Sequence, residues 1–159
     1  MNIFHYGDRL YVQTPTQLYR HQRVVNGGYG PGVAWLSDAT DLSNATALTI
    51  DGAVWLGGNS RVQRFDRGVE AGADLHSIDP ALGAVKALWT VAETPLLFIL
   101  DSENRRVVVY HKTDQKMVAQ YVHPLFSDAL GLTIDLTDKS AIVTSPTGVH
   151  TFPLTNMLP

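Results

Sequence analysis

The sequence predicts an all-β protein built from about four β-propeller blades, each a small antiparallel sheet of three or four strands. Two internal repeats support this prediction. Asn59-Ser60-Arg61-Val62 returns 45 residues later as Asn104-Arg105-Arg106-Val107, and Leu48-Thr49-Ile50-Asp51 returns unchanged 84 residues later, ending at Asp135. A period of about 40 to 45 residues is typical of a propeller blade, and 84 residues correspond to two such periods.

Two aromatic or apolar ladders follow the same period. The centre of the second strand recurs as Tyr11, Trp55, Phe98 and Ile142. The third strand carries an aromatic residue in each repeat, namely Tyr19, Phe65, Tyr110 and Phe152. Turn-forming Pro, Gly, Asn and Asp residues separate the second and third strands in every repeat. We therefore expect the two ladders to form the core between adjacent blades.

The remaining strands are assigned from shorter β-forming runs. First strands are expected at residues 2–6, 47–50, 87–91 and 131–134. Outer strands are expected at 33–36, 74–78 and 117–122, while residues 69–84 read as a loop with a weak strand. The fourth repeat has no convincing outer strand, because residues 153–159 include two prolines, which are poor ladder donors.

These strands give one repeat domain with blades at approximately residues 1–45, 46–85, 86–129 and 130–159. Four blades are the minimum for a closed ring. The alternative is an open arc, or a fragment of a larger propeller completed by other blades. The first blade begins with a full strand and leaves no chain to complete the last blade, so the arc is favoured.

Composition excludes several classes of protein. The 159 residues are 45% hydrophobic and 17% charged, which is unlike a disordered chain. The net charge of −3 provides no overall field for binding nucleic acid. No apolar run reaches the roughly 18 residues of a membrane span, and no signal peptide is evident. Cysteine is absent, so neither disulfides nor thiol chemistry indicate a compartment, and the localisation is unknown.

The loop from Asp101 to Tyr110 contains an Asp-x-x-Asn-x-Arg-Val pattern that leads into an aromatic-ended strand. This pattern resembles the NHL repeat, a blade that is also similar to those of the SMP-30/gluconolactonase group. Residues 59–65 match the same pattern without the Asp, and the outer two repeats keep only the strand spacing. A second likeness, carried by residues 52–56 and 65–68, is to C-terminal propeller domains of bacterial membrane proteins, which implies a membrane-associated parent protein.

The repeated polar residues are interpreted as structural. An Asp at the end of a strand accepts hydrogen bonds from turn amides, and Asn tolerates the left-handed conformation of a hairpin turn. An Arg on a strand packs its stem while its guanidinium reaches a carbonyl or carboxylate of a neighbouring blade. This interpretation covers six residues: Asn59, Arg61, Asn104, Arg106, Asp51 and Asp135.

Signals of catalysis are weak, and no cofactor is predicted. The six histidines do not pair at metal-ligand spacing, and the sequence has no nucleophile elbow. The SMP-30 resemblance implies a divalent metal held by carboxylates and an Asn in a central channel, where Glu93 and Asp51 could point. The main hypothesis is a non-catalytic protein- or ligand-interaction module. The alternatives are a metal-dependent lactonase-like hydrolase with an incomplete site and an RNA-binding NHL-type propeller.

Arginines near the third strands form a candidate interaction surface, composed of Arg61, Arg64, Arg105 and Arg106. Nucleic acid is a disfavoured partner, because the chain is acidic overall and the surface lacks an evident set of stacking aromatics. The expected partners are a protein or additional propeller blades. Open blade edges would also expose apolar surface and unpaired backbone groups, which predicts self-association of the chain.

Overall fold

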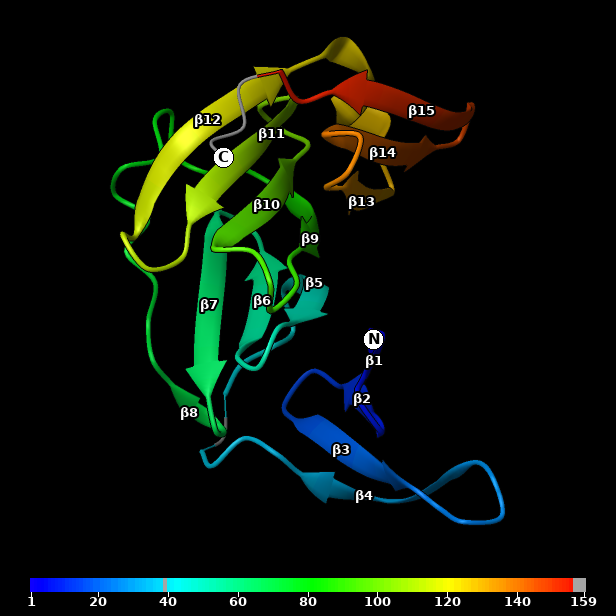
Figure 1. Ribbon diagram of the computed structural model, residues 1–159. Helices are drawn as coiled ribbons and strands as arrows, with labels where there is room; N and C mark the ends of the chain where they lie inside the picture. The colour runs from blue at the N-terminus through cyan, green and yellow to red at the C-terminus, as the bar shows by residue number, and fades with distance from the viewer. Residues whose placement is uncertain (39, 156–159) are drawn as a thin grey trace.

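The computed structural model describes residues 1–38 and 40–155, which fold into four antiparallel sheets arranged as an arc (Figure 1). The first sheet contains β1 (Ile3–Tyr6), β2 (Arg9–Gln13), β3 (Leu18–Arg23) and β4 (Tyr29–Ala34). The second contains β5 (Ala45–Ile50), β6 (Val54–Gly58), β7 (Arg61–Asp66) and β8 (Val69–Glu70). The third contains β9 (Val85–Trp89), β10 (Leu96–Asp101), β11 (Arg106–His111) and β12 (Lys116–Val122). A 3-10 helix, η1 (Pro124–Asp128), precedes the fourth sheet, which contains β13 (Gly131–Asp135), β14 (Ser140–Ser145) and β15 (Gly148–Pro153).

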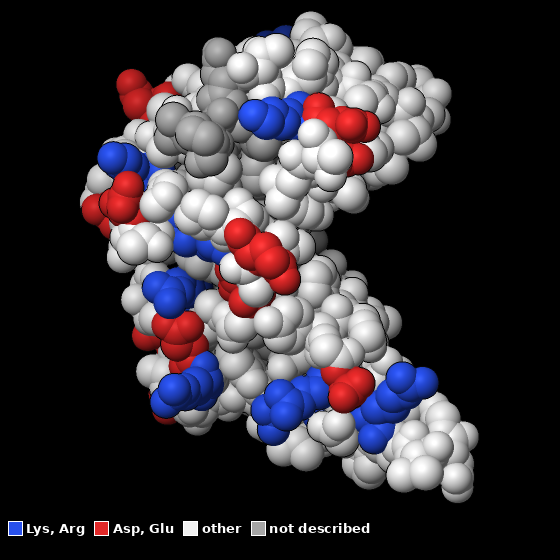
Figure 2. All heavy atoms as spheres, viewed as in Figure 1, with Lys and Arg blue, Asp and Glu red and all other residues white. Residues whose placement is uncertain are grey.

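Every sheet is a meander whose strands are paired in chain order, as in a propeller blade. The first strand of each blade lies on the concave side of the arc, and the space-filling view has the outline of a letter C (Figure 2). The prediction of an all-β arc of four blades is therefore confirmed. The described part of the fourth blade has three strands, and residues 156–159 of the predicted last blade lie outside the described residues.

The outer strand predicted at residues 74–78 is wrong. The outer strand of the second blade is β8, which follows β7 after a tight turn at Arg67 and Gly68, with φ of 50° and 86°. Residues 74–78 instead lie against the third blade, where the Tyr110 hydroxyl donates to the Asp74 carbonyl at 2.7 Å. The amide of Met117 also donates to the Ser77 hydroxyl at 2.7 Å. The segment links two blades and pairs with neither sheet.

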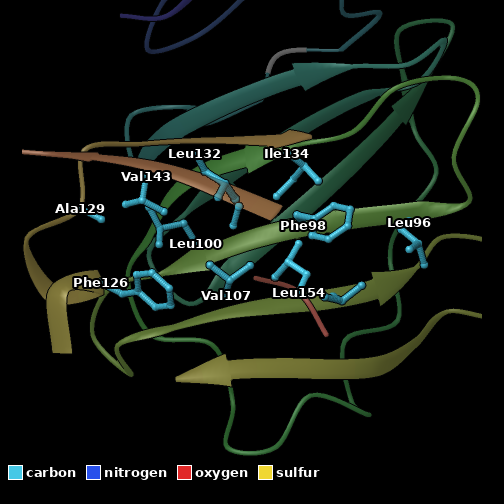
Figure 3. Packing of buried hydrophobic residues seen from close by; sticks show 12 residues of the cluster. Leu96, Phe98, Leu100, Val107, Phe126, Ala129, Leu132, Ile134, Val143 and Leu154 are labelled. Atoms are coloured by element: carbon cyan, nitrogen blue, oxygen red, sulfur yellow. The ribbon is translucent and has the colours of Figure 1, made fainter. Parts of the chain in front are cut away.

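Apolar side chains fill the space between each pair of adjacent blades. Between the first and second blades the cluster includes Tyr11, Leu18, Val54 and Phe65. Between the second and third blades it includes Trp55, Leu97, Val108 and Tyr110. Between the third and fourth blades it includes Phe98, Leu100, Phe126, Leu132 and Val143 (Figure 3). The blades are thus held together face to face, without a central core.

The two predicted ladders point in opposite directions along the arc. Trp55, at the centre of the second strand, packs toward the third blade, whereas Phe65 on the third strand packs toward the first blade. Phe98 and Tyr110 repeat this arrangement in the third blade. Phe98 faces forward, toward the next blade in the chain, and Tyr110 faces backward, toward the preceding blade. Because successive side chains of a strand point to opposite faces, each blade contributes one ladder member to each neighbour.

The end blades explain why the expected ladder core is only partly formed. Ile142 occupies the forward position of the fourth blade and is only half-buried, since no described blade follows it. Tyr19 lies on the backward face of the first blade and is 37% exposed. Strand pairing makes His21 the counterpart of Phe65, so the ladder in this blade is shifted by two residues from the predicted one. Phe152 is half-buried against η1, with its ring 4.9 Å from that of Phe126.

Truncating the forward ladder should therefore have very different effects at two equivalent positions. Phe98→Ala is expected to lower the free energy of unfolding by about 3–5 kcal/mol, because it opens a cavity in a fully buried interface. Ile142→Ala should cost about 1 kcal/mol or less, because its methyl groups already contact water. Urea denaturation followed by tryptophan fluorescence measures both, at a protein concentration low enough for the chain to be monomeric. Equal losses at the two positions would contradict the assignment of Ile142 to an uncovered face.

Tyr110 predicts an alkaline pH dependence of stability. Burial raises the pKa of its hydroxyl to about 12, with a smaller contribution from the Asp74 carboxylate. The unfolded chain loses this proton near pH 10, so the stabilisation by Tyr110 is complete below pH 10 and is lost as the pH rises toward 12. In urea titrations, the stability difference between the wild type and Tyr110→Phe should shrink over this interval. A difference that stays constant would contradict the assignment.

Candidate functional site

A buried polar cluster occupies the turn between β10 and β11. The Asp101 carboxylate accepts hydrogen bonds from Arg106 Nε at 3.0 Å and from the Asn104 amide group at 2.8 Å. It also accepts from the backbone amide of Gly83 at 3.2 Å. The guanidinium of Arg106 further donates to the carbonyls of Pro80 and Ala81 and to the side chain of Gln120. The cluster thus ties the turn to the segment that enters the third blade.

These contacts place Arg106 away from the molecular surface. Its side chain is 1% exposed and that of Asp101 is 0% exposed, so Arg106 cannot join the predicted basic interaction surface. Of the other three members, Arg61 and Arg105 are exposed, and Arg64 is half-buried beside Trp55. The three come from two different blades. Within the described part of the chain, no hydrogen bond or ion pair joins them as one patch.

The second blade lacks the carboxylate of this cluster for a steric reason. Gly58 pairs with Arg61 as Asp101 pairs with Arg106, and a Cβ atom at Gly58 would lie 2.1 Å from the Asn44 carbonyl oxygen. Asn59 and Arg61 therefore remain exposed, and they line a small pocket with Asp41. Hydrogen bonds from Ser43 lower the pKa of Asp41. The two copies of the motif thus have different environments, although three of their four residues are identical.

Asp51 and Asp135 also differ, despite their identical preceding residues. Asp51 accepts from the Trp55 indole at 3.1 Å and from the ammonium of Lys112 in the third blade. Among the described residues, Asp135 accepts only from backbone amides of its own turn, those of Thr137 at 2.9 Å and Asp138 at 3.0 Å. Asp135 has no described blade beyond it that could supply the equivalent of Lys112. Asp51 thus joins two blades, whereas Asp135 caps a turn.

The Asp51–Lys112 pair forms part of the second inter-blade groove, a hollow of about 440 Å³ between the second and third blades. Arg64 lies 5.6 Å from the centre of the Trp55 ring and pairs with Asp66 at 2.8 Å. Lys112 also donates to Thr90 Oγ1 at 2.9 Å. Both cations of this groove are therefore paired with carboxylates from its own lining.

The first inter-blade groove lies between the first and second blades and holds about 400 Å³. Its lining includes the arginines Arg9, Arg20 and Arg67, and the aromatic residues Tyr6, Tyr11 and Trp35. The rings of Tyr11 and Trp35 meet edge to face, with their centres 6.2 Å apart. No carboxylate is among the lining residues that the structure describes. Sequence reasoning missed this groove, because its arginines are separated by up to 58 positions and follow no motif.

A third hollow, the axial groove, holds about 470 Å³ and is lined by the first strands of all four blades together with the β9–β10 loop. Glu93 lines this groove, as the hydrolase alternative requires, but Asp51 lies in the second inter-blade groove. Within residues 1–38 and 40–155, no group of three His, Asp or Glu side chains is arranged to hold a metal ion. None of the helices in that part of the chain is long and apolar enough to cross a membrane.

Comparison with known proteins gives a match at the level of fold. No protein-family model and no curated protein sequence matches the chain. Among solved structures, Hsv2 of Kluyveromyces marxianus aligns with a TM-score of 0.67 at 10% identity, covering 98% of this chain and 50% of its own. Hsv2 of Kluyveromyces lactis aligns with a TM-score of 0.64 at 8% identity, covering 98% of this chain and 48% of its own.

Hsv2 is a seven-bladed β-propeller. The chain described here is an arc of a propeller. It spans about half the length of these solved structures, and at such low identity the likeness concerns the fold alone. The propeller fold implied by the NHL and SMP-30 resemblance is therefore confirmed, but the comparisons do not assign the chain to either family.

The buried cluster around Asp101 yields a stability prediction. Arg106→Gln should lower the free energy of unfolding by about 3–5 kcal/mol, because it leaves the buried Asp101 carboxylate without its cation. Arg105→Gln, a neighbouring change of the same charge on an exposed side chain, should change it by less than about 0.5 kcal/mol.

The double variant Asp101→Asn with Arg106→Gln tests the pairing directly. Its loss in urea unfolding should be smaller than the sum of the two single losses, because neither buried charge is then left alone. If Arg106→Gln does not fold, Arg106→Lys retains the charge and should show an intermediate loss. Strict additivity of the two single changes would contradict the coupling.

Proposed function

We propose that this chain is a non-catalytic interaction module whose two end sheets bind further propeller blades. The observation that carries the proposal is the direction of the two ladders. Ile142 points forward from the fourth blade and Tyr19 points backward from the first, each at a position that an adjacent blade covers elsewhere in the arc.

The first end sheet has the composition of a surface suited to a partner. Its backward face carries Ile3, Leu10, Val12 and Tyr19, of which Ile3 is 60% exposed, together with His5 and His21. A largely apolar face of a pleated sheet is complementary to another sheet at a separation of about 10 Å. The forward face of the fourth blade is more polar, with Thr133, Ile142 and Thr151 opposite one another across its three strands.

We infer that the blade recruited in solution is supplied by a second copy of the chain. The backward face of one copy would then meet the forward face of the other, so that two arcs would close a larger ring. The face of the first blade provides most of the apolar area, and the β-branched residues of the fourth blade fit a pleated surface. Closure of this kind removes both open ends at once.

The experiment is light scattering coupled to size-exclusion chromatography across a range of protein concentrations. The wild type is expected to self-associate, and Tyr19→Lys combined with Ile142→Lys should leave a monomer. Val69→Lys combined with Val122→Lys is the matched control, since both valines are more than half exposed and lie away from the end faces. A cooperatively unfolding wild-type monomer at tens of micromolar would overturn the proposal.

A further inference from the structure

The first and second inter-blade grooves are built from equivalent positions of successive blades. Tyr11 pairs with Arg20 across β2 and β3, just as Trp55 pairs with Arg64 across β6 and β7. By the same pairing, Tyr6 is the counterpart of Asp51. The two grooves therefore carry different side chains at equivalent positions of the same backbone geometry.

The charges of the two grooves differ at these equivalent positions. In the second groove, Lys112 is paired with Asp51, and Arg64 is paired with Asp66. In the first groove, the counterpart of Lys112 is Arg67, and the counterpart of Arg64 is Arg20. The two carboxylates are replaced by Tyr6 and Gln22, while Arg9 is added where the second groove has Ala53. The cations are retained and their counter-ions are removed.

The arginines of the first groove are free to bind a ligand. Arg20 and Arg67 make no hydrogen bond or ion pair with the residues that the structure describes, and Arg9 donates only to the exposed side chain of Gln22 at 3.3 Å. The space-filling view shows Lys and Arg atoms predominating on the lower part of the molecule, over the first two sheets (Figure 2). Three cations around one hollow repel one another unless an anion lies between them.

The aromatic residues limit the kind of anion that fits. Tyr6 and Trp35 are half-buried and give the groove an apolar wall, and the phenol of Tyr6 is an additional donor. The hollow of about 400 Å³ is in the size range of small-molecule sites. Guanidinium groups donate two parallel hydrogen bonds to the oxygens of a phosphoryl group.

We propose that the first inter-blade groove binds a phosphate monoester, with Arg20, Arg67 and Arg9 around the phosphoryl group and Tyr6 and Trp35 beside its organic part. This site is separate from the end faces of the arc and goes beyond the role proposed for them. If the groove did not bind a phosphate monoester, the proposed association of blades through the end faces would be unaffected.

The test uses the full chain and phenyl phosphate, monitored by phosphorus NMR titration at low and at physiological salt. Saturable binding is expected for the wild type, and Arg20→Gln and Arg67→Gln should each weaken it about tenfold, because each removes a charge-assisted contact. Arg105→Gln is the matched control, since it removes the same charge from an exposed turn of the third blade and should leave binding unchanged.

Tyr6→Asp is the sharper variant. It restores in the first groove the carboxylate that Asp51 provides in the second, so the new side chain should pair with Arg67 and abolish phenyl phosphate binding. Near-ultraviolet circular dichroism and urea unfolding establish that the variant is folded. Absence of saturable binding by the wild type, or binding that none of Arg20→Gln, Arg67→Gln and Tyr6→Asp weakens, would overturn the proposal.

A phosphate monoester can be soluble or can be carried by a lipid, and flotation with vesicles distinguishes the two. Recruitment to phosphatidic acid vesicles but not to phosphatidylcholine vesicles, lost in Arg20→Gln and Arg67→Gln, would assign the phosphoryl group to a membrane surface. Phenyl phosphate binding without such recruitment would assign it to a soluble ligand. Both results support phosphoryl recognition by the groove, and they differ only in its source.

Discussion

The structure depends on the face-to-face packing of pleated sheets, in which each internal blade must be apolar on both sides. Val54 and Trp55 illustrate the constraint, since they are adjacent in β6 and are buried in the cores toward the first and third blades, respectively. A slip of one residue in strand pairing would exchange these two surfaces. The register of each internal blade is therefore fixed by both neighbours, and the curvature of the arc follows from repeating one interface.

This constraint explains which parts of the fold can be predicted from the sequence. Trp55, Phe98 and Tyr110 recur at a regular spacing because each fills the same space between two sheets, and the repeat is visible for that reason. The sequence spacing predicts Tyr19 as the ladder residue of the first blade, although His21 occupies the equivalent position. The backward face of the first blade is not covered by another described sheet, so packing does not restrict which of its residues is aromatic. Prediction is accurate where a residue packs against an adjacent blade.

The polar sites are harder to predict, because their partners lie far apart in the sequence. The structural interpretation of Asp101, Asn104 and Arg106 rests on local turn chemistry, which the sequence contains. The absence of the same cluster in the second blade depends on the Asn44 carbonyl, which approaches Gly58 from an earlier segment. The first inter-blade groove likewise joins Arg20 and Arg67 from two blades, and neither residue belongs to a recognisable motif. Only the assembled sheets bring such residues together.

Differences between blades are concentrated at the ends of strands. Asp51, Asp135 and Tyr6 occupy equivalent positions but have different roles. Asp51 joins two blades and Asp135 caps a turn, whereas Tyr6 lines a groove that has no carboxylate in its described lining. Side chains inside the sheets cannot vary in this way, because a change of size or polarity would disturb the packing between two blades. At the strand ends a substitution changes the charge of one groove and leaves the packing intact. A repeated scaffold of this kind can therefore acquire a binding site in one groove while the next groove, with its cations neutralised, continues to hold two blades together.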